Sequence, residues 1–309
     1  MNLSNNINAA QKAFLEWKKV PFTERQKLLL KLADVLEKDK DQFANLITTE
    51  MHKPISQSIA EIEKSAGMIR YYAVADNVLK PEEIKTEFSI SEVHYDALGI
   101  ILGVMPWNFP FWQVLRFAVP AILAGNVILL KHASICFESG AAIEKVFRDA
   151  GFPDYIFKNL RIGHEEINEI LENPFVRGVS LTGSEKAGAN VAAIAGKNIK
   201  KSVLELGGSD AYIVLDDADV EKAAIEGPGG KLQNTGQVCN AAKRFIVHQK
   251  VEKEFVPKFV EVYNSYQPAD PFHMDTKQSK MARPDLADEL ENQYKKALKY
   301  GAEVVLALE

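Results

Sequence analysis

The sequence has few of the residues that build disulfide frameworks, metal centres or nucleic-acid-binding surfaces. Only two of its 309 residues are cysteines, Cys136 and Cys239, which argues against disulfides and against a zinc site made of thiolates. The six histidines show no helical pair spacing, so metal catalysis has no support. The formal net charge of −5 lacks the basic excess of proteins that bind nucleic acids. We therefore expect a small-molecule ligand, no metal and no nucleic acid.

Long apolar runs are also missing. No stretch approaches the roughly 20 apolar residues that a membrane-spanning helix needs, and the first residues lack the basic and apolar character of a leader. The hydrophobic share of 47% and the charged share of 26% are those of an ordinary soluble globular protein. The sequence thus predicts a cytoplasmic protein without a membrane segment, long enough for two domains.

The apolar pattern changes along the chain. Residues 1–80 predict helices, with a capping box at Thr23–Gln26, and residues 87–95 alternate like a half-exposed strand whose edge could pair with another chain. From Gly99 onward, short apolar strands alternate with helical stretches, which is typical of a doubly wound parallel sheet in an α/β fold. Strands are expected at 99–105, 126–130, 157–162, 176–181, 202–206 and 211–215 and, in a second unit, at 244–248 and 303–306.

A dinucleotide fingerprint of the form Gly-x-Gly-x-x-Gly does not occur. Gly183 and Ser184 instead follow a strand and open a helix, whose free N–H groups and positive dipole end could hold a pyrophosphate. Such a turn by itself is commonly only a helix cap. Ligands of parallel sheets lie at the carboxyl ends of the strands, where Asn108, Lys131 and Glu205 also collect.

Glu205 and Cys239 have the character of a base and a nucleophile. Glu205 ends an apolar, β-branched run, and Cys239 is a lone thiol on a turn that contains glycine, a pairing that suits covalent thiol chemistry. By residue type alone, a solvated Glu at a strand end and a small buried Cys are the commoner outcomes. The residues around them are therefore needed to decide.

Glu205–Gly208 reads Glu-Leu-Gly-Gly and is followed by Gly-Gln-Val-Cys at Gly236–Cys239. These two motifs, at this separation, resemble those of the aldehyde dehydrogenase family, and the resemblance covers essentially the whole chain. The resemblance makes Glu205 the general base and Cys239 the nucleophile. Met105–Pro110 matches the family's Pro-Trp-Asn-Phe-Pro segment, which makes Asn108, with the Cys239 backbone N–H, a hydrogen-bond donor to the oxyanion.

The resemblance also implies a domain organisation and a cofactor site. It assigns residues 1–208 to a doubly wound NAD(P)-binding domain with an oligomerisation-type strand near 86–98, and residues 209–309 to the N-terminal part of an α/β catalytic domain. Lys131 stands where the family has a lysine that bonds the adenosine ribose, and His132 replaces a more usual proline. A Glu at position 134 would repel a 2′-phosphate, so Ser134 leaves NADP admissible beside NAD. The other implied cofactor contacts are Met105, Pro106, Trp107, Gly183, Ser184 and Leu206.

Arg116 bears on the substrate. It lies eight residues beyond Asn108, where bacterial succinate-semialdehyde dehydrogenases have an arginine for the substrate carboxylate. A second arginine that some members place shortly before the cysteine is Gln233 here. The implied reaction is oxidation of an aldehyde, expected to be succinate semialdehyde, to the acid through a cysteine thiohemiacetal and thioester.

Some family features have no counterpart. The Glu-x-Phe-Gly-Pro segment that grips the nicotinamide ribose and the strand that pairs subunits are missing, so a family-type homo-oligomer is expected to be weakened. Pro228, between glycines, predicts an interrupted helix ahead of Cys239. Gln278–Lys280 replaces an Ile-Gly-Pro turn. The alternative function is a catalytically silent, truncated homologue that at most binds a dinucleotide or a full-length partner.

Overall fold

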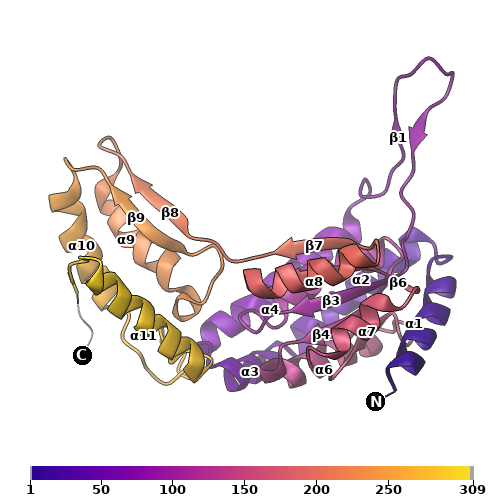
Figure 1. The fold of residues 1–309 in the computed structure, drawn as a ribbon, viewed down its shortest axis with the longest axis horizontal. Helices are drawn as coiled ribbons and strands as arrows, with labels where there is room; N and C mark the ends of the chain where they lie inside the picture. The colour runs from indigo at the N-terminus through magenta and orange to yellow at the C-terminus, as the bar shows by residue number, and fades with distance from the viewer. Residues whose placement is uncertain (1, 307–309) are drawn as a thin grey trace. The chain divides into compact units, whose positions relative to one another are not determined.

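A computed structural model describes residues 2–306, and the chain divides into two compact units (Figure 1). The first unit comprises Met1–Leu46 and Ile59–Leu206, and the second comprises Ile47–Ser58 and Gly207–Glu309. The short segment Ile47–Ser58, which contains the end of α3 (Lys40–Met51) and the start of α4 (Ile55–Val74), is thus assigned to the same unit as the C-terminal part of the chain.

The first unit is built on a five-stranded parallel sheet with the order β5-β4-β3-β6-β7. The chain starts in the middle at β3, adds β4 and β5 on one side, and then returns to add β6 and β7 on the other, so the strand order reverses between β3 and β6. Ligands of open α/β sheets bind at such a switch point. The strands are β3 (Ile100–Met105), β4 (Val127–His132), β5 (Phe157–Asn159), β6 (Val176–Thr182) and β7 (Lys201–Glu205). This confirms the expected parallel α/β fold.

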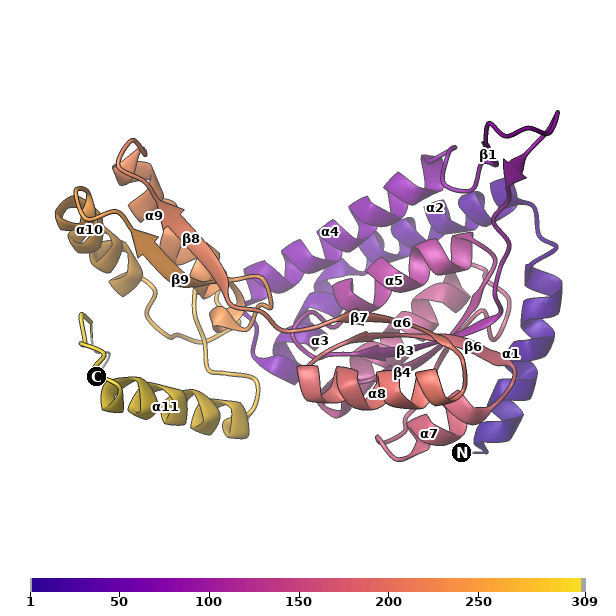
Figure 2. The ribbon, with the colours of Figure 1, turned by 45° about the horizontal axis from the view of Figure 1, so that its top comes forward.

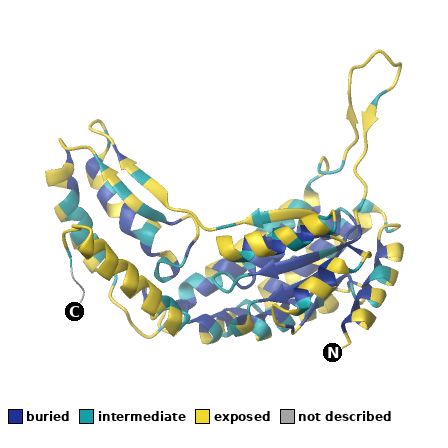
Figure 3. Cartoon of the chain, in the orientation of Figure 1, coloured by how far each residue is buried: buried dark blue, intermediate teal, exposed yellow. Residues whose placement is uncertain are grey.

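Helices cover both faces of this sheet, which explains why β3 is apolar along its whole length and β4 begins with four apolar residues. Every residue of β4 is buried, and Figure 3 shows the inner strands as buried and the edge strand β7 as mostly exposed. Figure 2 shows α5 and α8 on opposite faces of the sheet. This follows from right-handed crossovers, because α5 connects β3 to β4 and α8 connects β6 to β7, and these two connections run in opposite directions across the sheet. The covering helices include α5 (Trp112–Leu123), α6 (Phe137–Asp149), α7 (Glu166–Glu172) and α8 (Glu185–Lys197).

The N-terminal region is helical, as expected, and forms α1 (Leu3–Trp17), α2 (Phe22–Lys38), α3 (Lys40–Met51) and α4 (Ile55–Val74). The capping box at Thr23 was wrong, because α2 already begins at Phe22 and has no side-chain cap. The Pro21 carbonyl oxygen accepts from the N–H groups of Glu24 and Arg25 instead. A proline ahead of the first turn fixes the backbone for helix entry without a capping side chain.

The strand expected near 86–98 is almost entirely irregular. Only β1 (Glu82–Glu83) and β2 (Glu92–Val93) pair, antiparallel, and both are exposed. Phe88 and Ile90 between them are 71% and 76% exposed. An alternating sequence forms a regular strand only where one face can be buried, and the described part of this unit offers no such face to this hairpin.

The second unit contains a parallel pair, β8 (Asp210–Val214) and β9 (Ala242–Val247), with α9 (Val220–Leu232) and α10 (Glu252–Asn264) packed against it. Its buried core consists of Val214, Val220, Ala224, Val251 and Phe255. Residues 211–215 therefore belong to this small sheet and not to the large one. The last helix, α11 (Pro284–Lys299), has no buried residue, and the strand expected at 303–306 is irregular.

Helix α9 runs through Pro228, so the expected interruption was wrong. Gly227 explains why the segment stays helical, since a Cβ atom there would lie 3.1 Å from the rings of both Phe245 and Phe259. The close approach of these rings buries Gly227 and Pro228 in the unit. An internal proline costs about 3 kcal/mol of helix stability, and tertiary packing supplies most helical stability in proteins.

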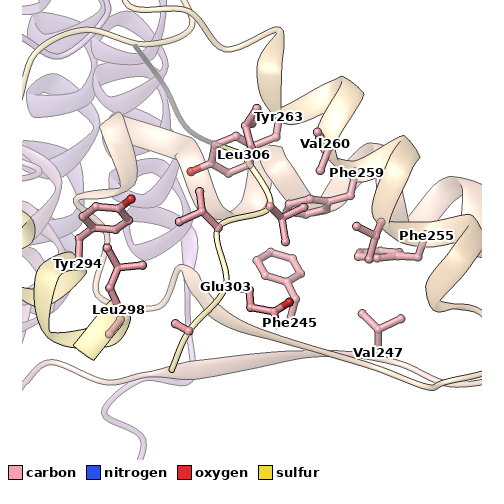
Figure 4. Close-up of a pocket in the computed structure, with 15 residues that line it drawn as sticks. Phe245, Val247, Phe255, Phe259, Val260, Tyr263, Tyr294, Leu298, Glu303 and Leu306 are labelled. Atoms are coloured by element: carbon pink, nitrogen blue, oxygen red, sulfur yellow. The ribbon is translucent and has the colours of Figure 1, made fainter. Parts of the chain in front are cut away.

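An apolar cavity of about 470 Å³ opens in the second unit between β9, α10 and the C-terminal segment (Figure 4). Phe245, Phe255 and Phe259 line one side, and Tyr294 and Leu298 of α11 line the other. None of the residues expected to carry chemistry lines it.

No helix within residues 2–306 is both long and apolar enough to cross a membrane.

Candidate active site

The carboxyl edge of the large sheet gathers the site residues expected in the first unit. Asn108 follows β3, Lys131 lies near the end of β4, Ser184 follows β6, and Glu205 ends β7. Because β3 pairs with β4 and β6, and β6 pairs with β7, all in parallel, these ends meet at one edge. The edge at which ligands of such sheets bind therefore carries an amide, a cation, a helix N-terminus and a carboxylate.

Glu61 fixes the end of the Met105–Pro110 turn. Its Oε1 accepts from the backbone N–H groups of Phe111 and Trp112, each at 2.9 Å, and only 3% of the residue is exposed. Free N–H groups at a helix N-terminus need such acceptors, and α5 has no capping side chain of its own. Sequence reasoning missed Glu61, which lies on the same buried face of α4 (Ile55–Val74) as Ser58 and Ser65.

His132 holds the same turn from β4. Its Nδ1 accepts from the N–H of Ala133 at 2.8 Å, so Nε2 carries the proton and donates to the Pro110 carbonyl oxygen at 3.0 Å. Burial lowers the pKa of His132 to about 4, because a charged imidazole would lose its hydration. The residue that replaces the family's usual proline is thus a neutral link between β4 and the Asn108 turn.

A cavity of about 560 Å³ lies along the first turns of α8. Val104 and Leu181 of the sheet, Ser184 at the helix N-terminus and His164 are among its lining residues. Ser184 caps α8, its Oγ accepting from the N–H of Ala187 at 3.3 Å. The remaining N–H groups of the first turn and the positive end of the helix dipole suit the phosphates of a dinucleotide.

Lys131 adds a cation to this region. The residue is only 3% exposed, and burial lowers the pKa of its ammonium group. The charge of Lys131, followed by burial, lowers the pKa of His164. Ser134, which bears on cofactor choice, is exposed two residues beyond the end of β4. A buried cation at the carboxyl edge of the sheet fits an anionic, ribose-containing cofactor.

Leu206 has a packing role as well as the cofactor role implied by the resemblance. A Cβ atom at Gly188 would lie 2.6 Å from the Leu206 side chain, so α8 packs directly on this residue. The Gly183 N–H donates to the Glu205 carbonyl oxygen at 3.0 Å. These contacts fix the start of α8 relative to the end of β7.

The structure brings together Arg116 and Glu205, the expected substrate arginine and general base. Arg116 Nη2 lies 3.0 Å from Glu205 Oε2, and the two side chains are 34% and 55% exposed. Exposed ion pairs contribute roughly 0–1 kcal/mol to stability, because water solvates both partners. A carboxylate ligand can therefore replace Glu205 at Arg116 with little loss.

Cys239 follows a strained turn in the second unit. Asn234, Thr235 and Gly236 have φ values of 51°, 56° and 74°, in the left-handed region that a β-branched threonine rarely adopts. The Asn234 N–H donates to Gln57 Oε1 at 2.7 Å, across 177 residues of sequence. Cys239 itself is exposed, whereas Cys136 is buried.

Gln278 and Ser279, which replace the expected Ile-Gly-Pro turn, support the cysteine loop. Gln278 Nε2 donates to the Leu232 carbonyl oxygen at 3.0 Å, and the Ser279 N–H donates to Thr235 Oγ1 at 3.4 Å. Both residues are buried. The Gln278 side chain, which the family's isoleucine could not match as a donor, therefore helps to hold the chain just before this turn. Gln233 lines a separate polar cavity of about 350 Å³ with Gln57 and Lys277.

Lys243 is a further residue of this loop that sequence reasoning missed. Its ammonium group donates to the carbonyl oxygens of Val238, Cys239 and Ala241 at 3.2, 2.6 and 3.3 Å. Asn108, Arg116 and Glu205 thus belong to the first unit, and Gln233, Cys239 and Lys243 to the second. Across residues 2–306, no group of three or more His, Cys, Asp or Glu side chains is placed to hold a metal ion.

We compared the chain with known proteins, and its curated relatives include succinate-semialdehyde dehydrogenases. The chain is 43% identical to a probable NADP⁺ succinate-semialdehyde dehydrogenase of Synechocystis sp. over 98% of its own length and 67% of the relative's. It is 40% identical to an NAD(P)⁺ succinate semialdehyde dehydrogenase of Escherichia coli over 99% and 66% of the two lengths. The chain thus spans about two thirds of these curated relatives.

Solved structures and a family profile agree with these relatives. The succinic semialdehyde dehydrogenase of Streptococcus pyogenes, solved in complex with NADP⁺, superposes with a TM-score of 0.96 at 35% identity, covering 99% of this chain and 69% of that one. The sequence profile of the aldehyde dehydrogenase family matches residues 1–308. The chain therefore belongs to the aldehyde dehydrogenase family.

Proposed function

We propose that this chain carries the cofactor-binding and nucleophile-bearing parts of an NAD(P)-dependent dehydrogenase that oxidises succinate semialdehyde to succinate. The observation that carries the proposal is the Arg116–Glu205 pair at the carboxyl edge of the sheet. It supplies a cation for the carboxylate of the substrate and a carboxylate that can take a proton from water. The first unit is then the dinucleotide-binding part, and the second unit bears Cys239.

In the proposed reaction, the Cys239 thiolate attacks the aldehyde carbon. A carbon–sulfur bond forms, the carbonyl electron pair moves to oxygen, and the thiohemiacetal oxyanion accepts hydrogen bonds from the Asn108 amide and the Cys239 N–H. When bound, the nicotinamide of the cofactor supplies a hydride acceptor. Cys239 then holds the acyl group as a thioester. Glu205 takes a proton from the water that attacks this thioester, which releases the acid and the thiol.

Residues of the first unit would hold the cofactor. The N-terminus of α8, capped by Ser184, suits the pyrophosphate, and Lys131 and Ser134 at the end of β4 suit the adenosine ribose. NADP⁺ appears in the names of the Synechocystis relative and the Streptococcus pyogenes structure. We include NADP beside NAD, because position 134 carries no carboxylate that would oppose a 2′-phosphate.

Replacing Ser134 tests the cofactor site. Ser134→Glu should weaken NADP binding about a hundredfold, because a carboxylate near a phosphate is repelled by a few kcal/mol, and should change NAD binding less than about threefold. Isothermal titration calorimetry measures both affinities without turnover. Ser134→Gln is the matched control, because glutamine has the size of glutamate but no charge. Equal losses for NAD and NADP would show that Ser134 does not lie beside the ribose.

Alkylation tests the nucleophile. Because burial protects Cys136, faster labelling of Cys239 alone would show only its exposure. We therefore expect Cys239 to react with iodoacetamide at least about tenfold faster than free glutathione at pH 7, since an activated thiolate is the reactive species. Peptide mapping identifies the labelled cysteine. A rate no higher than that of glutathione would remove Cys239 as an activated nucleophile.

Turnover decides between the two candidate functions. NADPH formation from succinate semialdehyde that Cys239→Ala abolishes would establish the dehydrogenase. Dinucleotide binding without turnover would support the catalytically silent homologue. A cytoplasmic location and a homo-oligomer belong to the same proposal, the latter supported by the exposed Phe88 and Ile90 of the β1–β2 hairpin.

A further inference from the structure

Lys243, at the start of β9, is tied to the loop that carries Cys239. Its three N–H donors match the three carbonyl oxygens within reach, those of Val238 at 3.2 Å, Cys239 at 2.6 Å and Ala241 at 3.3 Å. These bonds span both sides of the nucleophile. The ammonium group therefore fixes the backbone of the loop on which the Cys239 side chain stands.

One of these bonds acts on the peptide group that contains the Cys239 N–H. The Val238 carbonyl and the Cys239 N–H belong to the same amide, so a cation on the oxygen withdraws electron density from the nitrogen and strengthens the N–H as a donor. Within residues 2–306, the Cys239 N–H has no hydrogen-bond acceptor. It is thus free to donate to a ligand.

The charge of Lys243 is not neutralised by a nearby carboxylate. In the part of the chain that the structure describes, Lys243 forms no ion pair, and its bonds go to carbonyl dipoles alone. The ammonium group of Lys243 therefore acts on the loop of Cys239 without a compensating carboxylate.

We propose that Lys243 is a positioning residue, which fixes the cysteine loop and polarises the Val238–Cys239 peptide so that the Cys239 N–H stabilises the thiohemiacetal oxyanion. This inference rests on the proposed function, since it needs an oxyanion at Cys239. Lys243 does not touch the aldehyde. Its effect reaches the reaction through one peptide group.

Protection of Cys239 by aldehyde, without cofactor, tests the inference. A reversible thiohemiacetal blocks alkylation, so the concentration of succinate semialdehyde that halves the iodoacetamide rate measures oxyanion stabilisation. Loss of a whole oxyanion donor costs about a hundred- to a thousandfold in rate, and we expect the weaker donor in Lys243→Gln to raise this concentration about tenfold. Lys243→Arg, which keeps the charge, should stay within about threefold. Lys253→Gln, at an exposed lysine of α10, is the control and should match the wild type.

Labelling with [¹⁵N]cysteine gives a second readout, because the chain has only two cysteine amides to observe. In Lys243→Gln the Cys239 resonance should shift, since its amide is no longer polarised, whereas the Cys136 resonance of the first unit should stay in place. If Lys243 served only to keep the loop folded, Lys243→Gln would broaden or remove the Cys239 resonance. The molecules that stay folded would then still be protected by the same aldehyde concentration as the wild type.

The outcomes separate this inference from the proposed function. A wild type that aldehyde does not protect would refute the proposed function. A protected wild type with an equally protected Lys243→Gln would refute the role of Lys243 and leave the function intact. If Lys243→Gln does not fold, Lys243→Arg decides, because protection within about threefold of the wild type supports the charge and a tenfold loss overturns it.

Discussion

Acidification from pH 7 to pH 4 should destabilise the first unit by about 3 kcal/mol through His132 alone, and His132→Gln should abolish this contribution. The folded pKa of His132, about 4, lies below the ordinary value of 6.5. Between these values the unfolded chain binds the proton and the folded chain does not, so the free energy of unfolding falls as the pH falls. The contribution is fully present above pH 6.5 and lost once the pH approaches 4.

Urea unfolding followed by tryptophan fluorescence measures this effect. All three tryptophans, Trp17, Trp107 and Trp112, belong to the first unit, so the signal reports on the unit that contains His132. Carboxylates also titrate in this range, and the quantity to compare is therefore the difference between wild type and His132→Gln at each pH. Glutamine keeps a nitrogen donor for the Pro110 carbonyl. A difference that stays constant from pH 7 to pH 4 would contradict a buried, neutral His132.

Glu61→Ala should lower the free energy of unfolding of the first unit by about 3 kcal/mol. The change leaves the N–H groups of Phe111 and Trp112 without their acceptor, and each unsatisfied buried donor costs about 1–3 kcal/mol. It also removes the side-chain volume from a site that is 3% exposed. Urea unfolding at pH 7, with the same fluorescence signal, gives the value.

Glu61→Gln is the matched control, because its amide oxygen can accept the same two hydrogen bonds, and we expect it to cost about 1 kcal/mol. Equal losses in the two variants would show that the bonds to α5 are not what Glu61 contributes. Under the proposed function, Glu61→Ala also shifts the Asn108 turn, and a displacement of about 1 Å can cost about a hundredfold in rate. Stability and turnover would then fall together.

Much of the fold was predictable, because the strands of a parallel sheet are buried on both faces and read as short apolar runs. The run at 126–130 lies almost wholly in β4, Val127–His132, all of it buried. Two of the failures share a cause, which is that local patterns do not reveal tertiary partners. Pro228 stays in a helix because aromatic rings pack on Gly227, and residues 303–306 form no strand because the described chain offers them no pairing partner.

The expected site residues came from motifs, and their roles stay proposals. The sequence motifs indicate Asn108, Glu205 and Cys239, but not the groups that hold them. His132 stood out only as a departure from the family pattern, and Lys243 carries no local signal that distinguishes it from a surface lysine. Gln278 bonds a carbonyl 46 residues earlier in the chain. Contacts at such separations follow from the fold, and a single sequence does not show them.

The left-handed turn before Cys239 also has a consequence for the order in which the protein is made. Asn234 and Thr235 hold costly backbone conformations, and the bonds that stabilise them come from Gln57 and from Ser279, which lies 44 residues after Thr235. A ribosome that adds about 5–20 residues per second produces Cys239 some seconds before Ser279. The nascent chain therefore emerges with its thiol on a loop that cannot yet close. The sulfur of Cys239 acquires its surroundings only after the polypeptide beyond it has been synthesised.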